Sequence, residues 1–102
     1  MNNTDILRII SEQISKKLSD NNIENQIMPP PPNIPESLEY TRIYIFAFNK
    51  TTYFTDVVHI FLDGRIRCAK RKPWFSSLDT HISDPEFLDK ILEFINGDNR
   101  YD

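Results

Sequence analysis

Hydrophobic and polar positions follow different periods along this chain, and each period predicts a different kind of element. Between residues 4 and 19 the apolar side chains recur every three or four positions, at Ile6, Leu7, Ile10, Ile14 and Leu18. Charged residues fill most of the gaps, so the spacing predicts an amphipathic helix over 4–19. Asn3 or Thr4 can cap its start, and Asp20–Asn22 supplies residues that tolerate the left-handed backbone at a helix end.

The segment from 41 to 72 has a residue composition that is typical of β-strands. β-Branched and aromatic residues dominate 41–48 and 53–62, and a third run follows at 65–71. The Asp63-Gly64 pair between the last two runs is typical of a two-residue type I′ hairpin turn. We therefore predict a three-stranded antiparallel meander.

Counting back from that turn fixes a predicted register. It pairs Leu62 with Arg65 and His59 with Cys68, and directly opposed side chains share a face of the sheet. One face then carries Val57, His59, Phe61, Ile66 and Cys68, and the other carries Phe54, Val58, Ile60, Leu62, Arg65, Arg67 and Arg71. We expect the third strand to form the sheet edge, with its arginines turned outward and left without acidic partners in the chain.

The last predicted helix covers 84–96. Ser83 and Glu86 match a capping box, Pro85 suits the first turn, and Asn96-Gly97 supplies a stop. Its apolar stripe is Phe87, Leu88, Ile91, Leu92 and Ile95. The element order predicts a single α+β domain over 1–102, a two-layer α-β-β-β-α arrangement with both helices on one face of the sheet.

A proline-rich segment at 28–35 separates the first helix from the first predicted strand. Proline lacks the amide hydrogen and favours extended geometry before it, so this segment is expected to run as polyproline II. Its structural interpretation is a stiff strap that returns along the first helix. Its functional interpretation is a ligand for a proline-binding groove, because Pro29 and Pro32, and Pro32 and Pro35, each satisfy P-x-x-P.

Composition narrows the class of protein. The chain has 102 residues and one cysteine, which has no partner for an intramolecular disulfide. It shows neither a secretory leader nor the roughly 18 consecutive apolar residues of a membrane span. We therefore expect a cytoplasmic protein with no membrane contact. The excess of Ile and Asn over Ala and Gly is typical of AT-rich genomes, including those of viruses and mobile elements.

Charge is distributed unevenly. The net charge is −3, yet five of the twelve basic residues lie within eight positions, at Arg65, Arg67, Lys70, Arg71 and Lys72. Trp74 and Phe75 follow directly. This combination suits a protein-binding surface, and it also suits a nucleic-acid surface in which aromatic rings stack on bases. Three structural interpretations compete: basic residues that protect a sheet edge, a patch neutralised by the acidic C-terminal part, and aromatics that close the core.

Candidate catalytic and metal-binding groups are sparse. His59 and Cys68 are predicted cross-strand neighbours, which allows a cysteine–histidine pair, although both are placed on the face assigned to the core. His81 is expected in a surface turn. Cysteine and histidine spacings match no zinc motif, and the two glycines build no phosphate-binding loop. We predict no metal and no cofactor.

These observations favour a non-catalytic interaction module, in the class of small inhibitors, immunity proteins and regulatory subunits, that binds a protein partner. The expected contacts are Arg65, Arg67, Lys70, Arg71, Lys72, Trp74 and Phe75. A nucleic-acid-binding regulator using the same residues is the first alternative, and an enzyme with a Cys–His pair is the second. Pairing of the third strand with a second copy would give a homodimer.

Overall fold

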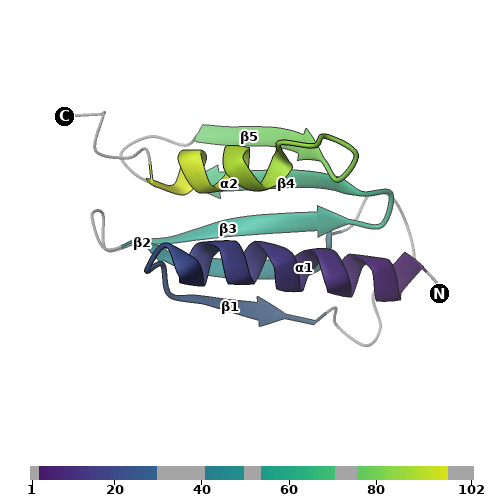
Figure 1. Cartoon of the computed structure of the whole chain (residues 1–102), viewed down its shortest axis with the longest axis horizontal. Helices are drawn as coiled ribbons and strands as arrows, with labels where there is room; N and C mark the ends of the chain where they lie inside the picture. The colour runs from purple at the N-terminus through teal and green to yellow at the C-terminus, as the bar shows by residue number, and fades with distance from the viewer. Residues whose placement is uncertain (1–2, 30–40, 50–53, 71–75, 97–102) are drawn as a thin grey trace.

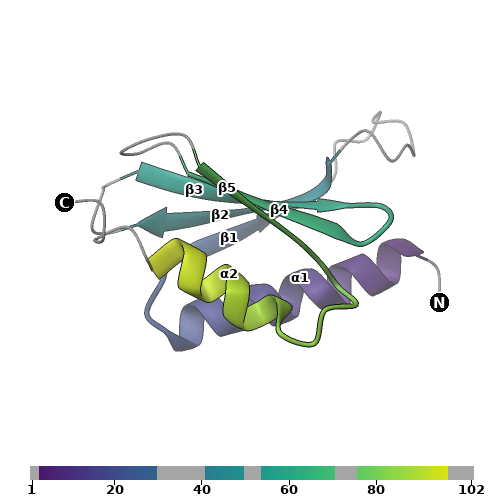
Figure 2. The same cartoon turned by 90° about the horizontal axis from the view of Figure 1, so that it is seen from above.

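The computed structural model describes residues 3–29, 41–49, 54–70 and 76–96, which form two layers. Along the chain the elements are α1 (Asn3–Asp20), β1 (Asn25–Met28), β2 (Thr41–Asn49), β3 (Phe54–Phe61), β4 (Arg65–Lys70), β5 (Ser76–His81) and α2 (Phe87–Asn96) (Figure 1). Figure 2 shows both helices on the same side of the sheet. The α+β class is therefore confirmed.

The described residues form a sheet of five antiparallel strands in the order β1-β2-β3-β4-β5. The prediction of three strands was wrong because it omitted β1 and β5. It also placed β4 at the sheet edge, whereas β4 pairs with β3 on one side and β5 on the other. Within the described residues the edges are β1 and β5, so β4 offers no unpaired edge to a second copy.

The core lies between the helices and the inner face of the sheet. From α1 it takes Leu7, Ile14 and Leu18, from α2 Phe87, Ile91 and Ile95, and from the sheet Ile43, Ile45, Ala47, Val58, Ile60, Ile66 and Cys68. α1 packs against β1 and β2, while α2 packs against β4 and β5 (Figure 1). Most of each predicted stripe thus faces the core, but Ile6 of the α1 stripe is exposed.

Asn22 terminates α1 by adopting a left-handed backbone conformation. Asn22 has a φ of 63° and stands just beyond the helix. The Ile23 amide donates to the Leu18 carbonyl at 3.0 Å and the Asn22 amide donates to the Ser19 carbonyl at 3.0 Å. This pair of bonds is the Schellman arrangement, which satisfies carbonyls that the helix leaves open. It turns the chain directly into β1.

The start of α2 differs from the predicted capping box. Asp84, not Ser83, accepts the hydrogen bond from the Glu86 amide, at 2.9 Å to Oδ1. The Ser83 amide instead donates to His81 Nδ1 at 3.0 Å. Residues 84–86 form a turn that leads into α2, which begins at Phe87 and not at residue 84 as predicted. The Glu86 carbonyl accepts the Lys90 amide hydrogen at 3.0 Å.

The β3–β4 turn is one residue longer than predicted. The Gly64 amide donates to the Phe61 carbonyl at 3.0 Å, and Gly64 has a φ of 91°. A type I′ turn requires positive φ at two consecutive residues, but among the described residues Gly64 shares positive φ only with Asn22. Leu62, Asp63 and Gly64 therefore form a three-residue loop with a glycine at its left-handed position.

That additional residue shifts the whole register. Val58 lies opposite Cys68 and His59 lies opposite Arg67, in place of the predicted pairing of His59 with Cys68. A shift of one residue moves a strand's side chains to the other face. Val58 and Ile60 consequently point into the core together with Ile66 and Cys68. The predicted face assignment of the middle strand was wrong, and that of the third strand was right.

Of the proline-rich segment 28–35, the structure describes only the start: Met28 ends β1, and Pro29 follows it. The predicted strap therefore lies largely outside the described residues.

Candidate functional site

The face of the sheet opposite the helices is the most distinctive surface of the described structure. Within the described residues no helix covers it (Figure 2). Strand alternation places the following side chains on it: Glu24, Gln26, Met28, Tyr44, Phe46, Phe48, Thr55, Val57, His59, Phe61, Arg65, Arg67 and Asp79. We call this set the open face. Phe46 and Phe48 keep 36% and 38% of their surface exposed, which is uncommon for phenylalanine.

Aromatic contacts order the middle of the open face. The Tyr44 and Phe46 rings are nearly parallel, with centroids 6.2 Å apart and an interplanar angle of 5°. The His59 ring meets Tyr44 edge-on at 5.3 Å. The Arg65 guanidinium carbon lies 4.6 Å from the centre of the Phe61 ring. Such contacts restrict the rings to one arrangement, which lowers the entropy lost when a partner packs on them.

The two arginines of β4 lie on this face, as their alternation with Ile66 and Cys68 predicted. Both have acidic partners within the chain, contrary to the prediction. Arg67 Nε is 2.7 Å from Asp79 Oδ1, and Arg65 Nε is 2.9 Å from Asp63 Oδ2. The hydrogen bond from Arg67 lowers the pKa of Asp79. Burial raises the pKa of Asp63, but hydrogen bonds from the Arg65 amide and guanidinium outweigh it, so this pKa is also lowered.

Lys70 was predicted as a partner contact and lies elsewhere. Its side chain points to the inner face and the residue is 1% exposed. Its Nζ donates to the Ile95 carbonyl at 3.4 Å and lies 4.6 Å from the centre of the Phe94 ring. A cation is stabilised at the negative end of a helix and over an aromatic face. Lys70 therefore belongs to the packing of α2 and is not accessible to a partner.

The remaining predicted contacts are Arg71, Lys72, Trp74 and Phe75. All four lie outside the described residues. Their participation in binding stays a prediction.

The predicted Cys–His pair does not form, because the two side chains lie on opposite faces of the sheet. Cys68 is 1% exposed among core residues. Burial and the negative charge of Asp56 raise its pKa to about 12. His59 lies on the open face, where partial burial and the charge of Arg67 lower its pKa. A protonated, buried thiol with no imidazole on its face is not an activated nucleophile.

His81 was expected in a surface turn and instead ends β5. Its Nε2 lies 3.0 Å from the Asp63 carbonyl oxygen, and its Nδ1 accepts the Ser83 amide hydrogen at 3.0 Å. A carbonyl oxygen only accepts, so Nε2 carries the ring hydrogen. The imidazole thereby connects the β3–β4 turn to the loop before α2.

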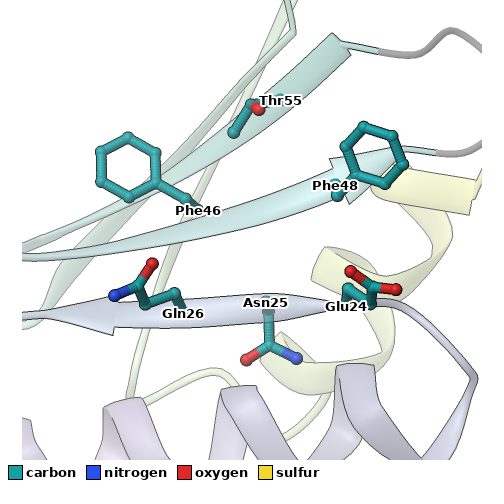
Figure 3. Close-up of a pocket in the computed structure, with 6 residues that line it drawn as sticks. All are labelled: Glu24, Asn25, Gln26, Phe46, Phe48 and Thr55. Carbon is teal, nitrogen blue, oxygen red and sulfur yellow. The ribbon is translucent and has the colours of Figure 1, made fainter.

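A shallow hollow of about 230 Å³ lies at the β1 side of the open face. Phe46 and Phe48 of β2 flank it, with Glu24 and Gln26 on one side and Thr55 of β3 on the other (Figure 3). Phe46 and Phe48 were not among the predicted contact residues. The signal was available, because Ile43, Ile45 and Ala47 alternate with Tyr44, Phe46 and Phe48, and only one of these sets can face the core.

The described segments contain neither a cluster of metal-ligand side chains nor a helix able to span a membrane. Their histidines, cysteine and carboxylates form no cluster of three that would hold an ion. Neither α1 nor α2 has the length and apolar character required to cross a bilayer. Searches of protein-family models, curated proteins and solved structures find no significant match to this chain.

Proposed function

We propose that this chain is a non-catalytic interaction protein that binds a protein partner across the open face. The observation that carries the proposal is the one-sided packing of the sheet: both helices cover the inner face, and exposed aromatic side chains occupy the other (Figure 2). Small inhibitors, immunity proteins and regulatory subunits are the kinds of protein in which such a surface would serve.

The energetics of association favour such a face. Burial of apolar surface yields about 25 cal/mol per Å², and aromatic side chains together with arginine dominate the binding energy of protein interfaces. Tyr44, Phe46 and Phe48 supply a central apolar strip. Arg65 and Arg67 lie to one side of that strip and are already paired with carboxylates. Their ordered guanidinium groups can direct hydrogen bonds to a partner's main chain.

Nucleic acid is the second candidate, because rings and arginines on one open sheet face also suit the stacking of bases. Two observations place it second. Arg65 and Arg67 each have a carboxylate within 3 Å, which reduces the local positive potential. The chain also carries a net charge of −3. Nucleic-acid binding depends on the release of counterions and falls steeply with salt, whereas an aromatic contact does not.

The proposed function is tested by comparing two exposed apolar residues on opposite layers. Phe46→Ser changes the open face, and Ile9→Ser changes α1, where Ile9 is 42% exposed. Immobilised wild type and both variants are offered an extract of the native host, and retained proteins are identified and their affinities measured. We expect Phe46→Ser to weaken the specific partner about tenfold or more, and Ile9→Ser to leave it unchanged. Equal retention by all three forms would place the interface elsewhere.

A further inference from the structure

Strand β2 and the residue just before β1 bring two phenyl rings and one carboxylate together at the hollow on the open face. Phe46 and Phe48 are two residues apart on β2 and share its outer side. The Phe48 amide donates to the Glu24 carbonyl at 2.8 Å, which fixes Glu24 beside Phe48. Gln26 lies opposite Phe46 in the β1–β2 register. Asn25, between them, points toward α1 and bonds Ser19, so its side chain leaves the hollow open (Figure 3).

The described glutamates, Glu24 among them, differ from most of the described aspartates in forming no ion pair. Six aspartates, at positions 5, 20, 63, 79, 84 and 89, form ion pairs with lysine or arginine. Among the described residues, no cationic side chain lies within ion-pair distance of Glu24, which is exposed. Its negative charge therefore stands beside two exposed ring faces, which carry negative π density as well.

We propose that this hollow binds the guanidinium group of an arginine that a protein partner presents. The inference rests on the proposed function and specifies one contact within it. A guanidinium is planar, stacks on aromatic rings and pairs with a carboxylate through two hydrogen bonds. The volume of about 230 Å³ corresponds to about eight water molecules at about 30 Å³ each. An arginine side chain, with its seven non-hydrogen atoms, is of this size.

Other ligands fit the hollow less well. An anion would be repelled by Glu24, and a purely apolar side chain would cover its carboxylate without supplying a hydrogen bond. A lysine ammonium is attracted by the same charges, but it is a compact, strongly hydrated ion that does not stack between rings. Shape and charge together therefore favour arginine.

The experiment titrates the full chain with N-acetylarginine methylamide and follows amide resonances by ¹H–¹⁵N NMR. We expect saturable shifts centred on residues 24, 26, 46 and 48. The citrulline analogue, in which a neutral urea replaces the guanidinium, is the matched probe and should produce no saturable shift. Citrulline or lysine analogues that bind as tightly as arginine would overturn the assignment, as would the absence of saturable shifts with arginine.

Two matched variants locate the contact. Glu24→Gln should weaken arginine binding about threefold, the effect of one exposed ion pair. Glu93→Gln, an exposed glutamate of α2, should leave it unchanged. Equal effects of the two variants would exclude a specific role of Glu24.

The inference and the proposed function fail in different ways. If Phe46→Ser abolishes partner binding while Glu24→Gln leaves it unchanged, the arginine contact is wrong and the interaction face stands. If the arginine probe binds at the hollow while Phe46→Ser leaves partner binding unchanged, the hollow is an arginine site and the proposed interface is wrong.

Discussion

The ammonium of Lys70 lies 3.4 Å from the carbonyl oxygen of Ile95, which joins the end of β4 to the last turn of α2 inside the core. Both residues are 1% exposed. The lysine stem fills core volume, and its charge sits at the negative end of the helix. A residue that composition alone assigns to a binding surface is thus part of the packing.

Replacement of Lys70 should therefore affect stability more than any surface lysine does. We expect Lys70→Ala to lower the free energy of unfolding by about 2–4 kcal/mol, because it leaves a cavity and removes a buried hydrogen bond. Urea denaturation monitored by circular dichroism measures this loss. Lys16→Ala removes an exposed pair with Asp20 and should cost less than about 1 kcal/mol. Equal losses would contradict the buried position of Lys70.

Gly64 should resist substitution for two separate reasons. Its φ of 91° is unfavourable for a residue with a Cβ, and an added Cβ would lie 2.9 Å from Ile82 Cγ1. We expect Gly64→Ala to destabilise the fold by about 1–3 kcal/mol. An Ile82→Ala background removes the two nearest contacts and leaves only His81 Cε1, at 3.1 Å, so the additional loss should be smaller. A double-mutant cycle with no coupling would show that Ile82 does not contact the new methyl group.

Cys68 should be unreactive in the native state. Its pKa of about 12 keeps it protonated at pH 8, and its burial blocks reagents. We expect no labelling by a thiol-specific reagent under native conditions and complete labelling in urea. A raised native pKa also means that this thiol's contribution to stability is present below its unfolded pKa and is lost as pH rises toward 12. Rapid native labelling would refute the buried placement.

Arg67 should control the titration of His59. The pKa of His59 is lowered by burial and by the charge of Arg67, so Arg67→Gln should raise it, as read from imidazole ¹H shifts. Arg65→Gln should leave it unchanged. A depressed native pKa contributes stability above the unfolded value near 6.5 that is lost as pH falls through the native pKa. A His59 pKa that is identical in wild type and Arg67→Gln would show that the two side chains are not neighbours.

Strong periodicity made parts of this fold predictable from sequence. The apolar stripes of both helices and the runs at 41–48 and 53–62 specified elements that the structure contains. The exposed arginines of β4 followed from their alternation with Ile66 and Cys68. In each case several apolar side chains follow the same period, so a single exception does not change the predicted element.

The edge strands were not predictable in the same way. β1 has four residues, of which Asn25 and Gln26 have low strand propensity, and β5 carries a single large aliphatic residue, Leu78. Polar edge strands are common because they discourage association between sheets. Their pairing with β2 and β4 is decided by tertiary contacts, which a local pattern does not contain.

The side chains of the open face were predicted incorrectly because the β3–β4 turn was assigned one residue too few. Asp63-Gly64 fits both a two-residue and a three-residue hairpin loop, and the choice between them reverses every side chain of β3. His59 was consequently assigned to the core with Cys68, and the aromatic strip of β2 was never connected with Arg67. Only the backbone conformation at Gly64 decides between these registers.

The strand order also has a consequence for how the protein assembles. In the described sheet, strands that pair are consecutive in the chain. The sheet can therefore form as successive hairpins between segments that are close in sequence. The two helices contact each other where Lys17 of α1 pairs with Asp89 of α2 at 3.0 Å. Because α2 packs against β4 and β5, the inner side of these two strands is shielded from water only when α2 has docked.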